Sequence, residues 1–258
     1  MKNFSAFKNL VVKDEFFLKI CNQITDFNQL KIGDKILVAV SGGVDSVALA
    51  LLMDTLQKFK LNIVHVNHNL RYESSQEELF VKKLASDLKI PFFVSHLNPD
   101  EIGKNMGVEQ WSRYERYRFF EHTLKKISGD WVMTAHHAND QIETTLMNIS
   151  RKTGMLGLRG IAKSRNKILR PLLENPKSEI LDFAKRIGFT YHSDKSNDDV
   201  SIPRNFIRHK IISSWEKKQP FLIKNFTSSS TYFKDWTDGF DYLIKTFIVN
   251  EINLTKNK

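Results

Sequence analysis

The chain has 258 residues, of which 41% are hydrophobic and 26% charged, with 39 Lys+Arg against 29 Asp+Glu. This composition excludes disorder as the default, and no segment approaches the ~18 apolar residues of a membrane-spanning helix. The single cysteine, Cys21, excludes disulfide scaffolds and thiol-relay enzymes. We therefore expect a cytoplasmic protein with no targeting segment, built as one large domain or as one domain with a small appendage.

The positive charge is concentrated in one part of the chain. Residues 151–210 carry 14 Lys+Arg against 6 Asp+Glu, whereas residues 1–150 carry 18 of each. Such a segment suggests a polyanionic partner, because Lys and Arg side chains that replace counterions on phosphates supply most nucleic-acid affinity. A solvated basic face is an equally simple explanation.

Short apolar strands alternate with helices along most of the chain. Strands are expected at 35–40, 62–66, 91–95 and 130–134, and helices at 13–27, 47–56, 75–88, 108–127, 141–149 and 178–187. The strands lack period-two alternation, which indicates burial on both faces, so the pattern predicts an α/β fold with a Rossmann-like parallel sheet covered by helices on both sides. The tail has weaker periodicity. We therefore expect a main domain at 1–212 and a small helical segment at 213–258.

The first expected strand is followed by a glycine-containing turn and then a helix. The turn reads Ser41, Gly42, Gly43, Val44, Asp45 and Ser46. The glycines allow close approach of backbone N–H groups to a ligand, and the helix N-terminus favours negative charge, so the segment could cradle phosphates. A tight turn capped by Ser or Asp is the alternative. No Walker lysine and no G-x-G-x-x-G follow, which argues against a γ-phosphate switch and a dinucleotide dehydrogenase.

Two further segments place basic side chains where a nucleotide could bind. His68 lies in a polar loop after the second strand, and ligands of parallel sheets bind beyond the carboxyl ends of strands. On the expected helix at 108–127, Arg113, Arg116 and Tyr117 share one face at i, i+3 and i+4. An exposed cationic face is the usual explanation for that helix.

The segment after the fourth strand combines histidines and acids. It contains His136, His137, Asp140 and Glu143. Asp140 and Glu143 have the spacing of a capping box, which would explain the acids but not the histidines. The group could instead hold Mg²⁺ or orient an amine, and we favour this functional interpretation.

A basic pair occurs within the positively charged segment. Arg204 and Arg208 stand at i and i+4 with Asn205 between them. Guanidinium groups bind phosphate through two parallel hydrogen bonds, so this pair could clamp a phosphate.

Together these motifs resemble the N-type ATP pyrophosphatases with a PP-loop, and among them the tRNA(Ile)-lysidine synthetases. The resemblance covers about 33–212 and rests on the order of its motifs, which are Ser41 to Ser46, His65-Val-Asn-His68, Arg113-x-x-Arg116-Tyr117, His136 to Glu143, Arg170-Pro-Leu-Leu173, and Ser196-Asn197 through Arg208. Asn69 stands where the family often has Gly, and Asn tolerates a positive φ.

The resemblance implies a reaction at the wobble cytidine of tRNA(Ile) with the anticodon CAU. ATP would adenylate the carbonyl oxygen at carbon two of the base and release pyrophosphate. The ε-amine of free L-lysine would then displace AMP and form lysidine. The expected partners are therefore ATP, Mg²⁺, free L-lysine and this tRNA.

The resemblance also implies roles for individual residues. The expected catalytic residues are Asp45, Arg113, Asp140 and Glu143. Asp140 and Glu143 would bind lysine, Asp45 and Asp140 would hold Mg²⁺, and Arg204, Asn205 and Arg208 would bind RNA. The expected ATP-binding residues are Ser41, Gly42, Gly43, Val44, Asp45, Ser46, His68, Arg113 and His137.

Other functions remain open from the sequence. A thiolating enzyme with a cysteine relay would need a second cysteine, and an amidating enzyme would need a glutaminase partner or domain. A non-catalytic adenine-nucleotide sensor is a rival from a different class.

Overall fold

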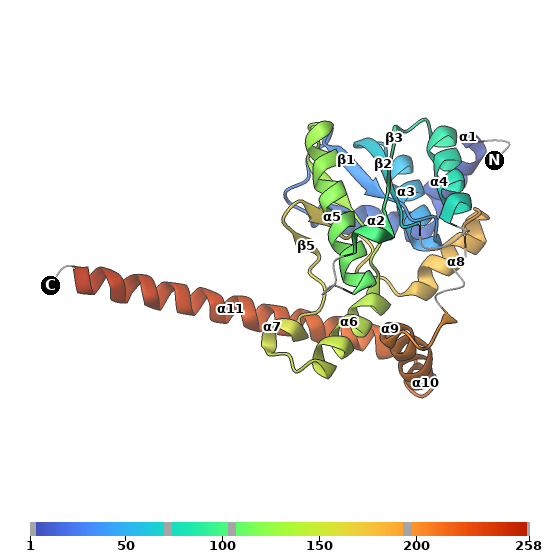
Figure 1. Cartoon of the computed structure of the whole chain (residues 1–258). Coiled ribbons are helices and arrows are strands. Elements are labelled where there is room, and N and C mark those ends of the chain that lie inside the picture. Colours follow the sequence, from blue (N-terminus) through green and yellow to red (C-terminus); the bar gives the residue numbers. More distant parts are fainter. Residues whose placement is uncertain (1–3, 70–73, 103–106, 193–197, 257–258) are drawn as a thin grey trace. The chain divides into compact units, whose positions relative to one another are not determined.

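The computed structural model describes residues 4–69, 74–102, 107–192 and 198–256. The chain divides into two compact units, unit 1 with 1–137 and 163–194 and unit 2 with 138–162 and 195–258 (Figure 1). The units interleave along the chain, whereas the sequence suggested one boundary at 212. The Ser196-Asn197 motif lies outside the described residues.

Unit 1 is built on a six-stranded sheet with the order β3-β2-β1-β4-β6-β5. The strands are β1 Lys35–Ala39, β2 Lys60–Asn67, β3 Phe92–His96, β4 Trp131–Met133, β5 Ser164–Arg165 and β6 Ile168–Leu169. Every neighbouring pair is parallel except β5 with β6, which is antiparallel. The expected parallel sheet is therefore confirmed, with an additional hairpin at one edge. Two-residue strands are too short to give a sequence signal.

Successive strand residues point to opposite faces of this sheet, and helices cover both faces. Ile36 and Val38 of β1 belong to the larger core, and Leu37 between them belongs to a smaller one. The larger core packs against α1 Phe4–Lys13, α2 Glu15–Thr25, α3 Val44–Leu56, α4 Ser74–Leu88 and α8 Lys177–Ile187. The smaller core packs against α5 Val108–Lys126. A short 3₁₀ turn, η1 Pro99–Glu101, precedes α5.

Residues that tolerate a positive φ follow two of these elements. Gly188 closes α8 with φ of 73°, the left-handed conformation that glycine adopts without strain. Asn69 has φ of 50°, so the tolerance of Asn for this region is used where the family often has Gly.

Unit 2 is helical. It contains α6 Ala138–Ser150, α7 Met155–Leu158, α9 Pro203–Phe206, a π-helical turn η3 Ile207–Ile212, α10 Ser213–Glu216 and α11 Leu222–Lys256. Its core joins Ala138 and Ile142 of α6 to Ile207, Ile212 and the start of α11. The expected helical tail is confirmed, with α11 as one helix of 35 residues. None of the helices in the described part of the chain is long and apolar enough to cross a membrane.

Candidate active site

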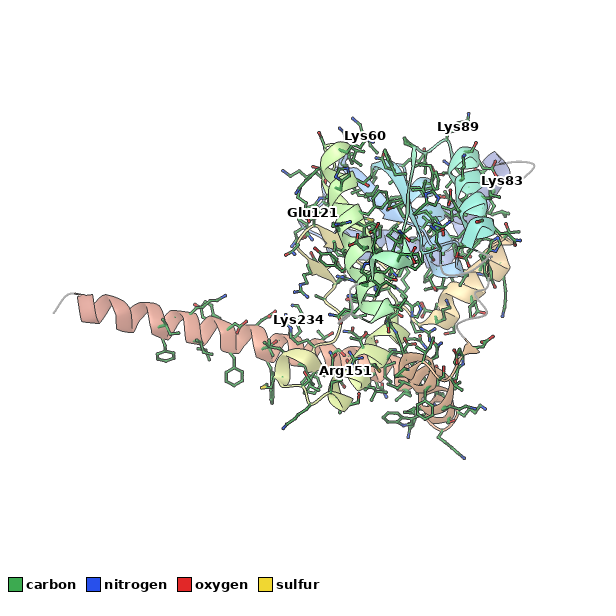
Figure 2. All side chains as sticks on the ribbon, in the orientation of Figure 1. Lys60, Lys83, Lys89, Glu121, Arg151 and Lys234 are labelled. Carbon is green, nitrogen blue, oxygen red and sulfur yellow. The ribbon has the colours of Figure 1, made fainter. Side chains whose placement is uncertain are left out.

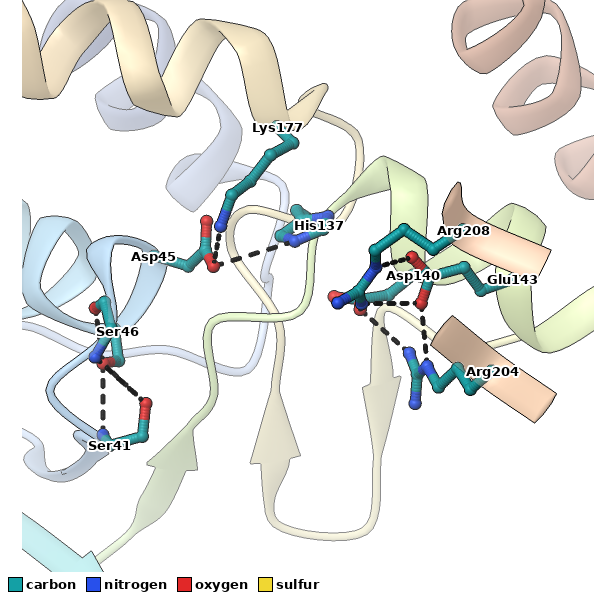
Figure 3. A network of polar contacts seen from close by, with 10 residues as sticks. Ser41, Asp45, Ser46, His137, Asp140, Glu143, Lys177, Arg204 and Arg208 are labelled. Carbon is teal, nitrogen blue, oxygen red and sulfur yellow. Dashed lines mark hydrogen bonds and ion pairs between the residues drawn. The ribbon is translucent and has the colours of Figure 1, made fainter. Parts of the chain in front are cut away.

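The turn after β1 is organised by the two serines that frame it. The Ser41 backbone N–H donates to Ser46 Oγ at 3.1 Å, and Ser46 Oγ donates to the Gly43 carbonyl at 2.9 Å (Figure 3). Helix α3 begins after Gly43 without a side-chain cap. The first N–H groups of a helix have no partner within it, and an uncapped start leaves them available to an anion. The alternative explanation, a turn capped by a Ser or Asp side chain, is therefore wrong, because the N-cap residue is Gly43.

Gly42 gives the turn its shape. Its φ is 100°, a backbone conformation that residues with a Cβ rarely adopt. Its carbonyl accepts a hydrogen bond of 2.9 Å from the His192 backbone N–H, and the ring of His192 lies edge-on to Phe80 with 4.9 Å between centroids. The segment after α8 therefore fixes the turn at the carboxyl end of β1.

Asp45 lies in the first turn of α3 and faces two cationic or ionisable side chains. Its Oδ2 pairs with Lys177 Nζ and lies 3.8 Å from His137 Nε2 (Figure 3). Its Oδ1 is buried and has no hydrogen-bond partner among the described residues. Buried polar atoms are nearly always satisfied, so this carboxylate oxygen is suited to coordinate a ligand.

Lys177 is not among the site residues predicted from the sequence. It is the first residue of α8, after Pro176. A helix N-terminus disfavours positive charge, so a lysine at this position is electrostatically unusual. That mismatch was the signal available in the sequence, although only the fold brings Lys177 to Asp45.

Helix α5 carries the arginines Arg113 and Arg116 of unit 1. Arg116 Nη2 lies 3.4 Å from His68 Nε2, so the loop after β2 meets this helix. Arg113 stacks on the Tyr117 ring, with its Cζ 5.2 Å from the centroid. Arg170, which follows β6, is only 4% exposed. The contact between Arg116 and His68 joins two of the motifs predicted from the sequence.

Unit 2 contains a cluster of two carboxylates and two guanidinium groups. Glu143 accepts hydrogen bonds from Arg204 Nε at 2.7 Å and from Arg208 Nε and Nη2 at 2.6 and 2.9 Å. Asp140 Oδ1 accepts from Arg204 Nη2 at 2.9 Å (Figure 3). The Glu143 side chain is fully buried, and Asp140 is 13% exposed. Burial opposes the charge on Arg208, but the hydrogen bond and charge of Glu143 outweigh it and raise the pKa of that guanidinium.

The capping-box explanation for Asp140 and Glu143 is wrong. Helix α6 begins at Ala138, so Asp140 lies within the first turn and is not the N-cap. Both carboxylates bind arginines that follow more than sixty residues later, as the pairing of Glu143 with Arg204 and Arg208 shows. The positions of these two carboxylates are therefore held by tertiary contacts with arginines and not by capping of their own helix.

The three residues expected to bind RNA have protein partners here. Arg204 and Arg208 bind the carboxylates just described, and Asn205 is buried and donates to the Asp199 carbonyl at 3.0 Å. Their contact with RNA stays a prediction.

Similarity to known proteins shows that the chain contains a PP-loop domain. The PP-loop domain family matches residues 17–215, which include the turn, Asp45 and the unit 2 cluster. A tRNA(Ile)-lysidine synthase from Caldanaerobacter subterraneus subsp. tengcongensis is 40% identical over 200 residues, covering 75% of this chain and 43% of that protein. The one from Petrotoga mobilis is 35% identical over 221 residues, covering 84% and 71%. The chain belongs to the tRNA(Ile)-lysidine synthase family of PP-loop proteins.

The chain spans about half the length of several of these relatives, including 49% of the one from Thermosipho africanus, which is 37% identical. Among solved structures, the U34-tRNA thiolase NcsA from Methanococcus maripaludis superposes with a TM-score of 0.70 and 21% identity, covering 85% of this chain and 80% of that one. This likeness shows the shared fold alone.

Proposed function

We propose that the chain ligates free L-lysine to carbon two of the wobble cytidine of tRNA(Ile) with the anticodon CAU, using ATP and releasing AMP and pyrophosphate. The observation that carries this proposal is the uncapped start of α3 beside Ser41, Ser46 and Asp45. An anion cradle without a Walker lysine suits cleavage between the α- and β-phosphates, because it holds the departing pyrophosphate. The membership in the lysidine synthase family supports the choice of substrates.

In the first step, the carbonyl oxygen at carbon two of the cytidine attacks the α-phosphorus of ATP, and the bond to pyrophosphate breaks. The backbone N–H groups of Val44, Asp45 and Ser46 would bind the leaving group at the positive end of α3. Lys177 is positioned by Asp45 at the same turn and would add a point charge to the phosphates. His137, beside Asp45, and His68, held by Arg116, are further proposed contacts to the nucleotide.

The residues present fit Mg²⁺ at this turn. Mg²⁺ in nucleotide sites is held by one or two carboxylates together with phosphate oxygens and waters, and the buried Oδ1 of Asp45 is such an oxygen. Among the described residues, no three His, Cys, Asp or Glu side chains gather to form a metal cage. When bound, Mg²⁺ would neutralise charge on the pyrophosphate. We propose Asp45 as its protein ligand at this turn.

In the second step, the ε-amine of lysine attacks carbon two, AMP leaves with the former carbonyl oxygen, and the amine loses a proton. The cluster of unit 2 suits the amino acid itself. A free amino acid carries a carboxylate and an ammonium group, and the cluster offers guanidinium groups beside carboxylates. We propose that Asp140 and Glu143 bind the ammonium group of the amino acid, and that Arg204 or Arg208 binds its carboxylate group.

The test is a turnover assay with ATP, labelled lysine and a tRNA(Ile) transcript bearing the CAU anticodon. The expected result is one AMP and one pyrophosphate for each lysine joined to RNA. The matched control is the same transcript with uridine in place of the wobble cytidine, which should accept no lysine. ADP as the main product would contradict the proposal, and binding of ATP without any turnover would favour a nucleotide sensor.

A further inference from the structure

A basic groove runs along one face of the unit 1 sheet, separate from the turn after β1. Helix α5 covers the centre of this face, and the hairpin of β5 and β6 extends the sheet beyond it. The space between them has a volume of about 490 Å³. Its lining includes the apolar side chains of Phe120, Val132 and Ile168. The groove exists because one helix covers a sheet that is wider than the helix.

The walls of the groove are strongly positive. Arg113, Arg165, Lys167 and Arg170 line it, and Glu121 is the one carboxylate among its described lining residues. Glu121 lies on α5 (Figure 2) and pairs with Lys125 Nζ at 2.9 Å, outside the groove. Its charge is therefore already balanced. The four cations of the lining face a space in which an anion would be strongly favoured.

Arg170 lies among like charges in this groove. Its side chain is almost completely buried. Burial lowers the pKa of Arg170, contact with Tyr117 opposes that shift, and the like charges of Arg113 and Arg165 lower the pKa further. Groups held together against their mutual repulsion in a cavity are typical of ligand sites.

The spacing of the cations fits an extended chain of phosphates. Lys167 precedes β6 and Arg170 follows it, so the two are separated by about 10 Å along the strand. Two side chains that bind the same phosphate must both reach its oxygens within ~3 Å. Cations at the two ends of a strand are therefore better placed to bind two successive phosphates than to bind one. Tyr117 of α5 also lines the groove, and its aromatic ring is of the kind on which single-stranded bases stack.

The groove also has a direction. β6 and β1 run parallel in the same sheet through β4, so Arg170 and the turn after β1 both follow the carboxyl ends of their strands. Arg113 is near the start of α5, which is the end of this helix beside Arg170 in the groove lining. A strand of RNA lying in the groove would therefore end at the sheet edge that carries Ser41 to Ser46.

We propose that this groove binds the sugar–phosphate backbone of single-stranded RNA, namely loop nucleotides next to the base that is modified. The identity of that RNA rests on the proposed function, but the contact with single-stranded RNA does not. Within the basic segment, Arg165 and Lys167 of the β5–β6 hairpin would contact the RNA, whereas Arg204 and Arg208 bind carboxylates.

The test uses the full chain with Arg165→Gln and Lys167→Gln combined. Both side chains lie on the edge hairpin, and neither belongs to the proposed catalytic groups. The matched control combines Lys82→Gln and Lys83→Gln, two exposed lysines of α4 on the opposite face of the sheet; Lys83 is labelled in Figure 2. Affinity for a fluorescent anticodon stem-loop RNA is measured by anisotropy between 50 and 200 mM salt, without lysine. ATP affinity and melting temperature are measured on the same preparations.

We expect the hairpin variant to bind the RNA at least ~10-fold more weakly and to lose about 1.4 from its salt slope, since each single-strand phosphate contact contributes ~0.7. The control should stay within about twofold, and ATP affinity should be unchanged in both. RNA affinity and slope equal to the parent would overturn the proposal, and so would an equal loss of ATP affinity, which would assign the groove to the nucleotide. If the hairpin variant loses RNA affinity but the parent protein never joins lysine to RNA, the RNA-binding role of the groove is supported and the proposed function is wrong.

Discussion

Neutralising Glu143 tests whether the unit 2 cluster is held together by its charges. Glu143→Gln keeps the size of the side chain but removes the charge that binds Arg204 and Arg208. The Glu143 side chain is fully buried and accepts three hydrogen bonds from the two guanidinium groups. Breaking a buried ion pair costs about 3–5 kcal/mol because the remaining charges are left uncompensated.

The expected cost is smaller than that because the arginines retain contact with solvent. Arg204 and Arg208 are 28% and 32% exposed, so water recovers part of their solvation. We expect the free energy of unfolding to fall by about 2–4 kcal/mol. For a chain of this size, that corresponds to a fall in melting temperature of roughly 5–15 °C.

Urea unfolding monitored by circular dichroism measures this change. Glu216→Gln makes the same chemical change on α10 of the same unit and should cost less than ~0.5 kcal/mol. A double-mutant cycle of Glu143→Gln with Arg208→Gln should give a coupling energy of at least ~1.5 kcal/mol. The KM for lysine should rise by at least ~10-fold in Glu143→Gln if the carboxylate takes the ammonium charge. A coupling energy near zero with an unchanged KM for lysine would refute both parts of the reasoning.

Three further predictions concern unit 1. Asp45→Asn should lower ATP–pyrophosphate turnover by ~10²-fold and shift its Mg²⁺ dependence to higher concentration, and an unchanged Mg²⁺ titration would remove Asp45 as a ligand. Gly42→Ala should destabilise the fold by about 1–2 kcal/mol in urea unfolding, because φ is 100° and the new Cβ makes only ordinary contacts, 3.6 Å from Val81 at the nearest. Burial lowers the pKa of His65, although its hydrogen bond to the Val40 carbonyl acts in the opposite direction. The unfolded state therefore binds more protons below pH ~6.5, and the free energy of unfolding should fall as the pH drops below that value, by at most ~1.4 kcal/mol per pH unit from this residue. His65→Asn should flatten the profile, and an identical profile would exclude His65 as its source.

The sequence by itself determined the main sheet and the turn at its edge. Apolar strands without alternation, separated by helices, are compatible with few folds other than a parallel sheet covered on both faces, and the strands at 35–40 and 62–66 are β1 and β2 of the structure. Gly42, Gly188 and Asn69 adopt positive φ where the sequence has residues that tolerate it. These features are local, because backbone sterics and hydrophobic periodicity act within a few residues.

Only the tertiary structure decided which charged groups meet. Asp45 pairs with Lys177, 132 residues away, and Glu143 pairs with Arg208, 65 residues away, and no spacing rule connects such positions. The same holds for the groove, since a hairpin of two-residue strands gives no periodic signal and its cations gather only when β6 joins β4. Ion pairs and cavities depend on chain segments that the fold brings together, whereas a local pattern records only the neighbours of each residue along the chain.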